Sequence, residues 1–268
     1  HGTYAGKFPE YCLIARYYCP KGHTTIGLIP EFFCSRLPGT LDEVEQVVLS
    51  HGHMDHYGGM AEMIGSLPRK PVDLYLHPDA LIKTRFVRLP DGREVKYSPP
   101  DVERLKASGA RMMITKEPAL LASGFFGYLG EIPRLNDFET GYPYMFNLES
   151  GSPASDLMKD DTAVVICVKN RGLVVITGCA HSGVVNTVWH AKKLTGIEDV
   201  YLVMGGFHLT GSIFEPRIER TVEEMIKIDP VYVAPTHCTG WKAMGRFSEV
   251  FGEKFILNTV GTTIIMKG

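Results

Sequence analysis

The chain has 268 residues, 44% of them hydrophobic and 22% charged, which is the balance of an ordinary globular protein. Its 28 Lys and Arg residues nearly cancel its 30 Asp and Glu residues, which excludes the electrostatic footprint of a nucleic-acid or anionic-membrane binder. No apolar run approaches the roughly 18 residues of a membrane span and no signal peptide opens the chain, so we expect a cytoplasmic protein.

The first predicted elements surround a histidine-rich motif. Residues 44–49, VEQVVL, are a β-branched run that predicts a buried strand. The segment 56–67, HYGGMAEMIGSL, places apolar residues at helical spacing, so the motif between them lies on a strand-to-helix turn. A second strand is predicted over 72–78 and a helix with a glycine stop over 101–109.

The second half alternates strands and helices. Residues 162–178 read as a hairpin whose turn is at Asn170-Arg171-Gly172. In order, it is followed by a helix over 184–194, a strand over 200–207, a helix over 216–228, a strand over 231–238 and a helix that ends near 251. The helix over 216–228 is predicted to place Ile218, Val222, Met225 and Ile226 on one face.

The segment 118–160 is the irregular part of the sequence, rich in glycine, proline and aromatic residues. A loop of this length in a compact domain is usually a lid, a binding wall or an oligomer contact, and packing of the rings into the core is the alternative. The aromatic residues are Phe125, Phe126, Tyr128, Phe138, Tyr142, Tyr144 and Phe146.

Six cysteines, at positions 12, 19, 34, 167, 179 and 238, are too sparse and uneven for a small disulfide scaffold. Reduced thiols in a cytoplasmic protein are the simpler interpretation. Pairing of Cys12 with Cys19 stays open, because the sequence does not fix their separation in space.

The motif LSHGHMDHYGG, residues 49–59, predicts a metal centre. Residues i and i+2 of extended backbone project to the same side, so His51 and His53 can address one ion. Asp55 and His56 lie just past them and can address a second ion, and such ligands suit zinc, iron or manganese. A polar helix cap with incidental histidines is the less favoured alternative.

Four ligands from one turn cannot complete two coordination shells, so further ligands must come from distant strand ends. His181 in TGCAHSG, His208 in GGFHL and His237 in PTHCTG each stand where a predicted strand meets a loop, which is where open sheets place ligand sites. The other histidines considered, His23, His77 and His190, have no such context and are interpreted as structural.

The motif LSHGHMDHYGG resembles the signature of the metallo-β-lactamase superfamily, and TGCAHSGVVNTV, GGFHL and PTHCTG together resemble one branch of it. That branch contains metal-dependent hydrolases and 7,8-dihydropterin-6-methyl-4-(β-D-ribofuranosyl)aminobenzene-5′-phosphate synthase. The resemblance implies an α/β fold, a four-layered αβ/βα sandwich over residues 41–268, preceded by an atypical segment over 1–40. It implies two divalent ions, zinc first and iron or manganese as alternatives.

The sequence departs from the superfamily pattern in two places. Residues 1–40 lack the usual Asp-Thr-Gly turn, so the first strands are altered or missing. Many relatives carry a bridging aspartate where this chain has Cys179, which is either a soft thiolate ligand or a small buried hydrophobe. Asp160 or Asp161 could supply the carboxylate instead, although a solvated turn is the favoured interpretation of this pair.

The predicted metal ligands are His51, His53, Asp55, His56, Cys179, His181 and His237. The leading function is a dinuclear metal-dependent hydrolase that uses a metal-bound hydroxide on a phosphoester, lactone, sulfate ester or similar small molecule. Asp55 would orient the nucleophile and His208 would donate a hydrogen bond or a proton to the substrate; metal ligation and a structural role are the alternatives for His208.

Two other functions stay open. One is a pterin-pathway transferase that joins a dihydropterin diphosphate to an aminobenzene ribose phosphate, and the other is a non-enzymatic metal or ligand sensor. No nucleic-acid or membrane partner is expected, and a homo-oligomer is possible on the sequence alone.

Overall fold

The computed structural model describes residues 44–89, 91–259, 262 and 264, together with the backbone of strands over 13–19 and 22–28. The pairing of Cys12 with Cys19 and the role of His23 lie outside the described side chains. The domain boundary at residue 40 stays a prediction. Within the described residues, no helix has the length and apolar character needed to cross a membrane.

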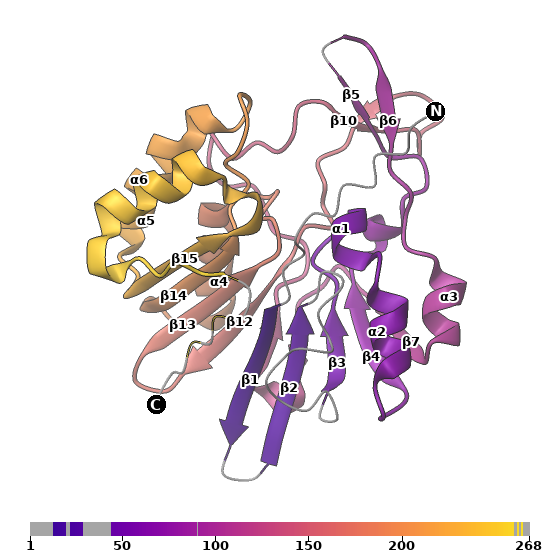
Figure 1. Cartoon of the computed structure of the whole chain (residues 1–268), viewed down its shortest axis with the longest axis horizontal. Coiled ribbons are helices and arrows are strands. Elements are labelled where there is room, and N and C mark those ends of the chain that lie inside the picture. Colours follow the sequence, from indigo (N-terminus) through magenta and orange to yellow (C-terminus); the bar gives the residue numbers. More distant parts are fainter. Residues whose placement is uncertain are drawn as a thin grey trace.

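Two large sheets form the centre of the described fold (Figure 1). The first has the strand order β1 (Leu13–Cys19), β2 (Gly22–Leu28), β3 (Val44–Val48), β4 (Val72–Leu76) and β7 (Ala110–Ile114). The second has the order β15 (Tyr232–Thr236), β14 (Val200–Gly206), β13 (Gly172–Thr177), β12 (Ala163–Val168), β9 (Phe126–Tyr128) and β8 (Ala119–Leu121). In each sheet the strands that lead toward the predicted ligands pair in parallel.

Side-chain alternation along the strands divides the core into layers. In β12, Val164 and Ile166 pack in the cluster that also contains Val48 of the first sheet, so this cluster fills the space between the sheets. Ala163 and Val165 point the other way and pack with the helices α4 (Val184–Thr195), α5 (Ile218–Ile228) and α6 (Trp241–Phe251).

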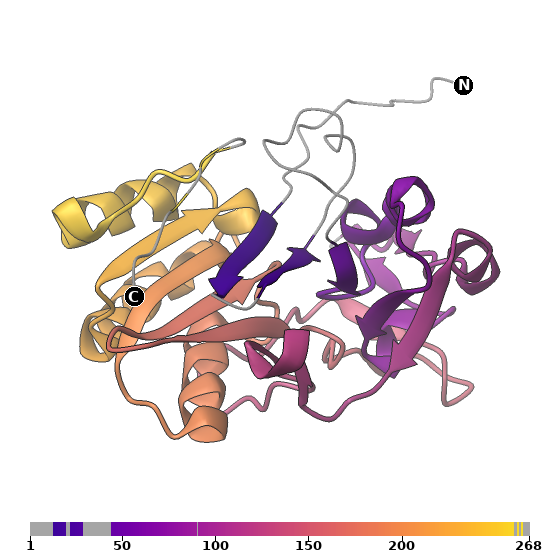
Figure 2. The same ribbon diagram turned by 90° about the horizontal axis from the view of Figure 1, so that it is seen from below.

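The first sheet is covered in the same way. Its outer face packs against α2 (Met60–Ser66) and α3 (Val102–Ala107), where Ile64 and Leu105 are buried. Helices therefore lie on the two outer sides and the sheets face each other, as Figures 1 and 2 show. The predicted four-layered αβ/βα sandwich is confirmed.

Three sequence predictions need correction. The helix after the histidine motif is two short helices, α1 (Met54–Tyr57) and α2. The segment 118–160 is not irregular throughout, because it holds β8, β9, β10 (Met145–Asn147) and β11 (Ala154–Ser155). The last two join β5 (Phe86–Arg88) and β6 (Glu94–Lys96) in a small sheet. Ile226 is 51% exposed because it lies about 100° around the helix from the buried Met225.

A buried carboxylate caps α4, the helix that follows the TGCAHSG motif. The Glu139 side chain accepts hydrogen bonds from the backbone N–H groups of Val185 (3.0 Å) and Asn186 (2.9 Å). These N–H groups have no partner inside the helix, so the cap satisfies them and fixes the entry of the helix. A Cβ atom at Gly183 would overlap this carboxylate, and Gly183 has a positive φ of 96°.

We expect Gly183→Ala to destabilise the fold more than Gly196→Ala. Both glycines have positive φ, but a Cβ at Gly196 meets no atom of the described residues within 4 Å. The backbone cost of about 1–2 kcal/mol is common to both variants, whereas the overlap with Glu139 adds about 1–3 kcal/mol. Urea denaturation of the two variants measures this difference, and equal midpoints would contradict the capping role of Glu139.

Candidate metal centre

The predicted ligands come from loops at the carboxyl ends of parallel strands. His51 and His53 follow β3, and Asp55 and His56 lie in α1 directly after them. The other three histidines stand in equivalent places: His181 after β13, His208 after β14 and His237 after β15. Because such strand ends meet at one edge of a sheet, residues up to 186 positions apart are collected in one place.

His51, His53 and His181 form the first group. The ring centroids of His51 and His53 are 4.6 Å apart, and those two rings lie 4.7 and 4.8 Å from the ring of His181. All three side chains are buried. Three imidazoles in mutual contact, contributed by two different sheets, are a donor set that suits a divalent transition metal.

Asp55, His56 and His237 form the second group. Asp55 Oδ2 lies 3.4 Å from His56 Nε2 and 3.3 Å from His237 Nε2. Burial acts to raise the pKa of Asp55, but hydrogen bonds from His237 and His56 outweigh it and hold the pKa well below its usual range. The side chain is therefore a carboxylate, the form that binds a metal.

Cys179 lies between the two groups. Its Sγ lies within 4.8 Å of donor atoms of His51 and His181, and also within 4.8 Å of donor atoms of Asp55, His56 and His237. Its distance to His56 Nε2 is 3.2 Å. The side chain is only 3% exposed, which fits the interpretation of Cys179 as a small buried residue. Its distances to the two groups fit the other interpretation, a thiolate ligand. It is a buried small side chain, and it occupies the position from which one sulfur could reach both groups.

The imidazoles fit metal binding because their nitrogens lack other partners. Within the described part of the chain, the Nε2 atoms of His51, His53 and His181 are buried without a hydrogen bond. Such groups are costly to bury unless a ligand satisfies them. Burial lowers the pKa of His51 and His181 well below the usual value and that of His53 to about 4. These rings are therefore neutral and offer lone pairs to an ion.

A neighbouring hydroxyl orients two of the rings. Ser50 Oγ lies 3.1 Å from His51 Nδ1 and 3.4 Å from His56 Nδ1. A hydrogen bond at Nδ1 leaves Nε2 as the nitrogen that faces the ligand group. A Cβ atom at Gly178 would overlap this hydroxyl, so the glycine before Cys179 makes the arrangement possible.

Backbone strain is concentrated at the same loops. Ala180, His208 and His237 have φ values of 53°, 47° and 53°, in the left-handed region that non-glycine residues rarely adopt. Each follows one of the parallel strands β13, β14 and β15. Strain of this kind persists where surrounding structure enforces it, and it gathers at binding and catalytic sites.

Asp160 and Asp161 do not form a solvated turn, so that sequence interpretation is wrong. Both are 0% exposed. Asp160 accepts a 2.7 Å hydrogen bond from Gly52 N–H, and Asp161 accepts a 2.8 Å bond from Ser182 N–H. Neither belongs to a ligand group found among the described residues. Their carboxylates hold the two loops that carry the ligands, one loop from each half of the sandwich.

Two residues near the centre were not identified in the sequence analysis. Arg85 is buried and contacts Asp156 at 2.7 Å and Asp160 at 2.8 Å, so it neutralises the carboxylate that holds Gly52. Cys238 Sγ lies within 4.8 Å of donor atoms of Cys179 and His208. Its position next to His237 at a strand end was the available clue.

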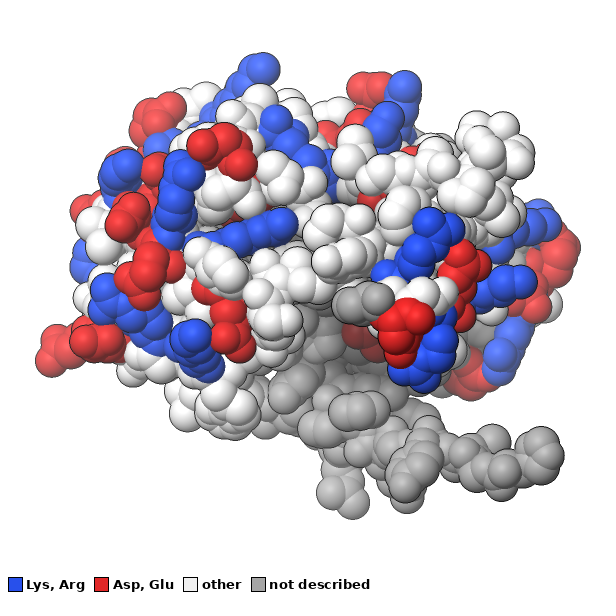
Figure 3. Space-filling view, turned by 90° about the horizontal axis from the view of Figure 1, so that it is seen from above, with Lys and Arg blue, Asp and Glu red and all other residues white. Residues whose placement is uncertain are grey.

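Aromatic rings stand beside the imidazole cluster. The ring of Tyr97 lies 4.8 Å from that of His53, and the ring of Phe214 lies 4.4 Å from that of His208. Tyr142 contacts Phe214 at 5.3 Å, so part of the aromatic segment 118–160 does reach the centre. Phe126 and Tyr128 of the same segment pack in the core instead. On the face seen in Figure 3, charges of both signs are interspersed toward the flanks and the middle is mainly uncharged.

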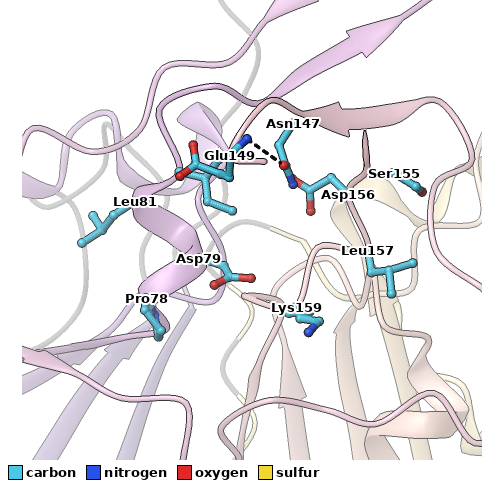
Figure 4. Close-up of a pocket in the computed structure, with 10 residues that line it drawn as sticks. Pro78, Asp79, Leu81, Asn147, Glu149, Ser155, Asp156, Leu157 and Lys159 are labelled. Atoms are coloured by element: carbon cyan, nitrogen blue, oxygen red, sulfur yellow. Dashed lines mark hydrogen bonds between the residues drawn. The ribbon is translucent and has the colours of Figure 1, made fainter. Parts of the chain in front are cut away.

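A separate polar pocket of about 510 Å³ lies beside the Arg85 network. In Figure 4, Asp79 and Lys159 extend toward its interior, and Asp156, the ion-pair partner of Arg85, belongs to its wall. None of the predicted metal ligands lines it. We therefore assign the metal chemistry to the histidine cluster and not to this pocket.

We expect purified, metal-replete protein to carry close to two transition-metal ions per chain. The expectation rests on two of the three donor groups that share Cys179 within the described residues, the one with His51 and His181 and the one with Asp55, His56 and His237. Elemental analysis after expression with zinc, iron or manganese measures the ratio. Absence of bound metal would contradict it, and a single ion would restrict binding to one of the two groups.

Comparison with known proteins agrees with this geometry. The 7,8-dihydropterin-6-methyl-4-(β-D-ribofuranosyl)-aminobenzene-5′-phosphate synthase of Methanocaldococcus jannaschii is 33% identical over 219 residues, which cover 79% of this chain and 72% of the relative. An uncharacterized protein of the same organism is 28% identical over 229 residues, covering 85% and 81%. No protein-family model matches the chain.

A solved structure agrees as well. A metal-dependent hydrolase of the β-lactamase superfamily superposes with a TM-score of 0.67 at 25% identity, covering 82% of this chain and 78% of the other. The fold, the position of the histidine groups and the level of identity to the synthase lead to one conclusion. The chain belongs to the metallo-β-lactamase superfamily, in the branch that includes the dihydropterin synthase.

Proposed function

We propose that the protein is a metal-dependent transferase that joins a dihydropterin diphosphate to an aromatic amine bearing a ribose phosphate. The observation that carries the proposal is the pair of aromatic rings beside the cluster, Tyr97 against His53 and Phe214 against His208. A planar ring bound between them would present its substituent to the ligand groups. The 33% identity to a synthase of this type supports the same reaction.

The metal ions, Asp55 and His208 would have different roles in this reaction. When bound, divalent ions supply Lewis-acid stabilisation to the charge that develops on a diphosphate leaving group. Asp55 is half-exposed, so it holds the second group together at the side open to substrate. His208 Nδ1 is buried and has no hydrogen-bond partner in the described structure, which leaves it free to donate a hydrogen bond or a proton to the substrate.

A metal-dependent hydrolase is the second candidate. The similarity to a metal-dependent hydrolase of the superfamily favours it, as does the exposed carboxylate of Asp55, which could orient an attacking water. Its substrates would be phosphoesters, lactones, sulfate esters or similar molecules. A non-enzymatic sensor is less favoured, because the named relative and the solved structure are both described as enzymes.

Product analysis separates the two enzymes. Metal-loaded protein is incubated with a 6-hydroxymethyl-dihydropterin diphosphate, with and without an aminobenzene ribose phosphate, and the products are resolved by mass spectrometry. The transferase predicts a coupled product only when the amine is present. Release of the hydroxymethyl-dihydropterin alone, at the same rate with and without amine, would favour the hydrolase and overturn the proposal.

His208→Ala should leave the metal content unchanged and lower turnover by about 10²-fold, the lower end of the effect of a single proton donor. Elemental analysis and steady-state rates on this one variant test the assignment. Loss of metal would make His208 a ligand. Unchanged turnover with a lowered melting temperature would make it structural.

A further inference from the structure

Two thiols meet at the edge of the metal centre. The Sγ atoms of Cys179 and Cys238 lie within 4.8 Å of each other. The Cys238 thiol also donates a 3.6 Å hydrogen bond to the backbone carbonyl of Cys179. These cysteines are 59 residues apart and come from the ends of β13 and β15, so their contact depends on the folded sheet.

A glycine on the strand between them provides the space. β14 lies between β13 and β15, and a Cβ atom at Gly206 would stand 2.7 Å from Cys238 Sγ and 3.2 Å from Cys179 Cα. Any other residue would force the Cys238 sulfur away from this position. With glycine at this position, no side chain of β14 stands between the two cysteines.

The two thiols differ in access. Cys179 is buried, whereas Cys238 is partly exposed. A ring nitrogen of His208 lies within 4.8 Å of Cys238 Sγ, and His56 Nε2 lies 3.2 Å from Cys179 Sγ. Imidazole beside a thiol favours reaction with oxidants, and a second thiol within reach resolves the first oxidation product. A reagent would therefore meet Cys238 first and Cys179 second.

We propose that Cys179 and Cys238 are an oxidation site, at which a peroxide converts the two thiols to a disulfide. The Cys238 sulfur attacks one peroxide oxygen, which breaks the O–O bond and leaves a sulfenic acid and one molecule of water. The Cys179 sulfur then displaces the hydroxyl group from the sulfenic sulfur, which forms the S–S bond and a second water. Together the two thiols lose two electrons, and the peroxide is reduced to two water molecules.

The disulfide would change metal binding, and this part of the inference rests on the proposed metal centre. Cys179 belongs to both ligand groups, so a bond to Cys238 takes its sulfur out of reach of an ion. A thiol engaged in a disulfide is no longer a thiolate donor. Oxidation and full metal occupancy therefore exclude each other, and a reductant restores the metal-binding form.

The test uses the full chain, first reduced and metal-loaded, then treated with hydrogen peroxide. Peptide mapping by mass spectrometry should find the Cys179 and Cys238 peptides cross-linked, and elemental analysis should find metal lost. Dithiothreitol followed by fresh metal should reverse both changes. Cys238→Ser should give no cross-link and keep its metal under peroxide, whereas Cys167→Ser, at an exposed cysteine on β12, should behave as the parent.

Each of the other outcomes contradicts one part of the proposal. If the reduced protein binds no metal, the metal centre itself fails. If it binds metal but peroxide gives free thiols, over-oxidised thiols or a cross-link to a different cysteine, the oxidation site fails. A Cys179–Cys238 cross-link without metal loss would overturn the exclusion of metal by the disulfide. Peptide mapping needs only the parent chain, so it decides the question even if Cys238→Ser does not fold.

Discussion

Asp55→Ala should lower turnover by about four orders of magnitude while the fold persists. The Asp55 carboxylate contacts both His56 and His237, so its loss breaks the second ligand group. An ion that stabilises transition-state charge contributes several kcal/mol, and about 5 kcal/mol corresponds to that loss of rate. The side chain is half-exposed and packs in no core cluster of the described residues, so little stability should be lost with it.

Steady-state rates, elemental analysis and thermal unfolding of Asp55→Ala measure the three quantities separately. Met54→Ala is the matched control, because Met54 is the exposed neighbour on the same short helix and contributes no ligand. The control should keep normal turnover. An Asp55→Ala variant with normal turnover and full metal occupancy would refute a mechanism that depends on two ions.

Asp160→Ala should reduce the free energy of unfolding of the metal-free protein by about 3–5 kcal/mol, as removal of one partner from a buried ion pair does. Asp160 is 0% exposed and accepts from both Arg85 and the backbone of Gly52. Its removal leaves Arg85 with Asp156 as its remaining buried carboxylate and Gly52 N–H without its partner. Metal affinity should fall by about 10–100-fold, because the loop that carries His51 and His53 is no longer held.

The control for Asp160→Ala is Asp137→Ala, which breaks an exposed, solvent-screened ion pair with Arg220 and should lower the free energy of unfolding far less. Burial acts to raise the pKa of Asp160, but Arg85 outweighs it and lowers the pKa. The stabilisation by the Asp160 carboxylate is therefore fully present above its unfolded-state pKa near 3.8. It is lost as the pH falls through its lower pKa in the folded state. Chemical denaturation at neutral and acidic pH should show the difference between parent and variant shrink toward acid.

The sequence predicted the parts of the site that depend on residues close to one another in the chain. The β-branched runs before each ligand loop specify strands, and histidines at the ends of four such strands predict a common edge, because parallel strands align their carboxyl ends. His51, His181 and His237 are far apart in the chain, yet each follows its strand directly. The four layers were implied by the resemblance to the superfamily, and the structure gives their physical basis, since β12 alternates between two buried faces.

The parts that were missed depend on pairings between distant residues. Arg85 and Asp160 are 75 residues apart in the sequence, and Cys179 and Cys238 are 59 residues apart. No residue pattern near either member of a pair indicates its partner. Asp160 and Asp161 were interpreted as a solvated turn, and charged residues are indeed rarely fully buried without partners. Those partners, Arg85 and the backbone N–H groups of Gly52 and Ser182, appear only when the two halves are docked.

The adjacent aspartates also fix the length of the chain between the halves. Asp160 holds the loop of Gly52 and Asp161 holds the loop of Ser182, and Thr162 N–H bonds to Ser50 O at 2.9 Å. An insertion or deletion here would shift one anchor relative to the other and misalign both loops at once. The exposed residues 148–155 just before them carry no such double anchor. Length variation among related chains should therefore be tolerated in 148–155 and absent from 160–162.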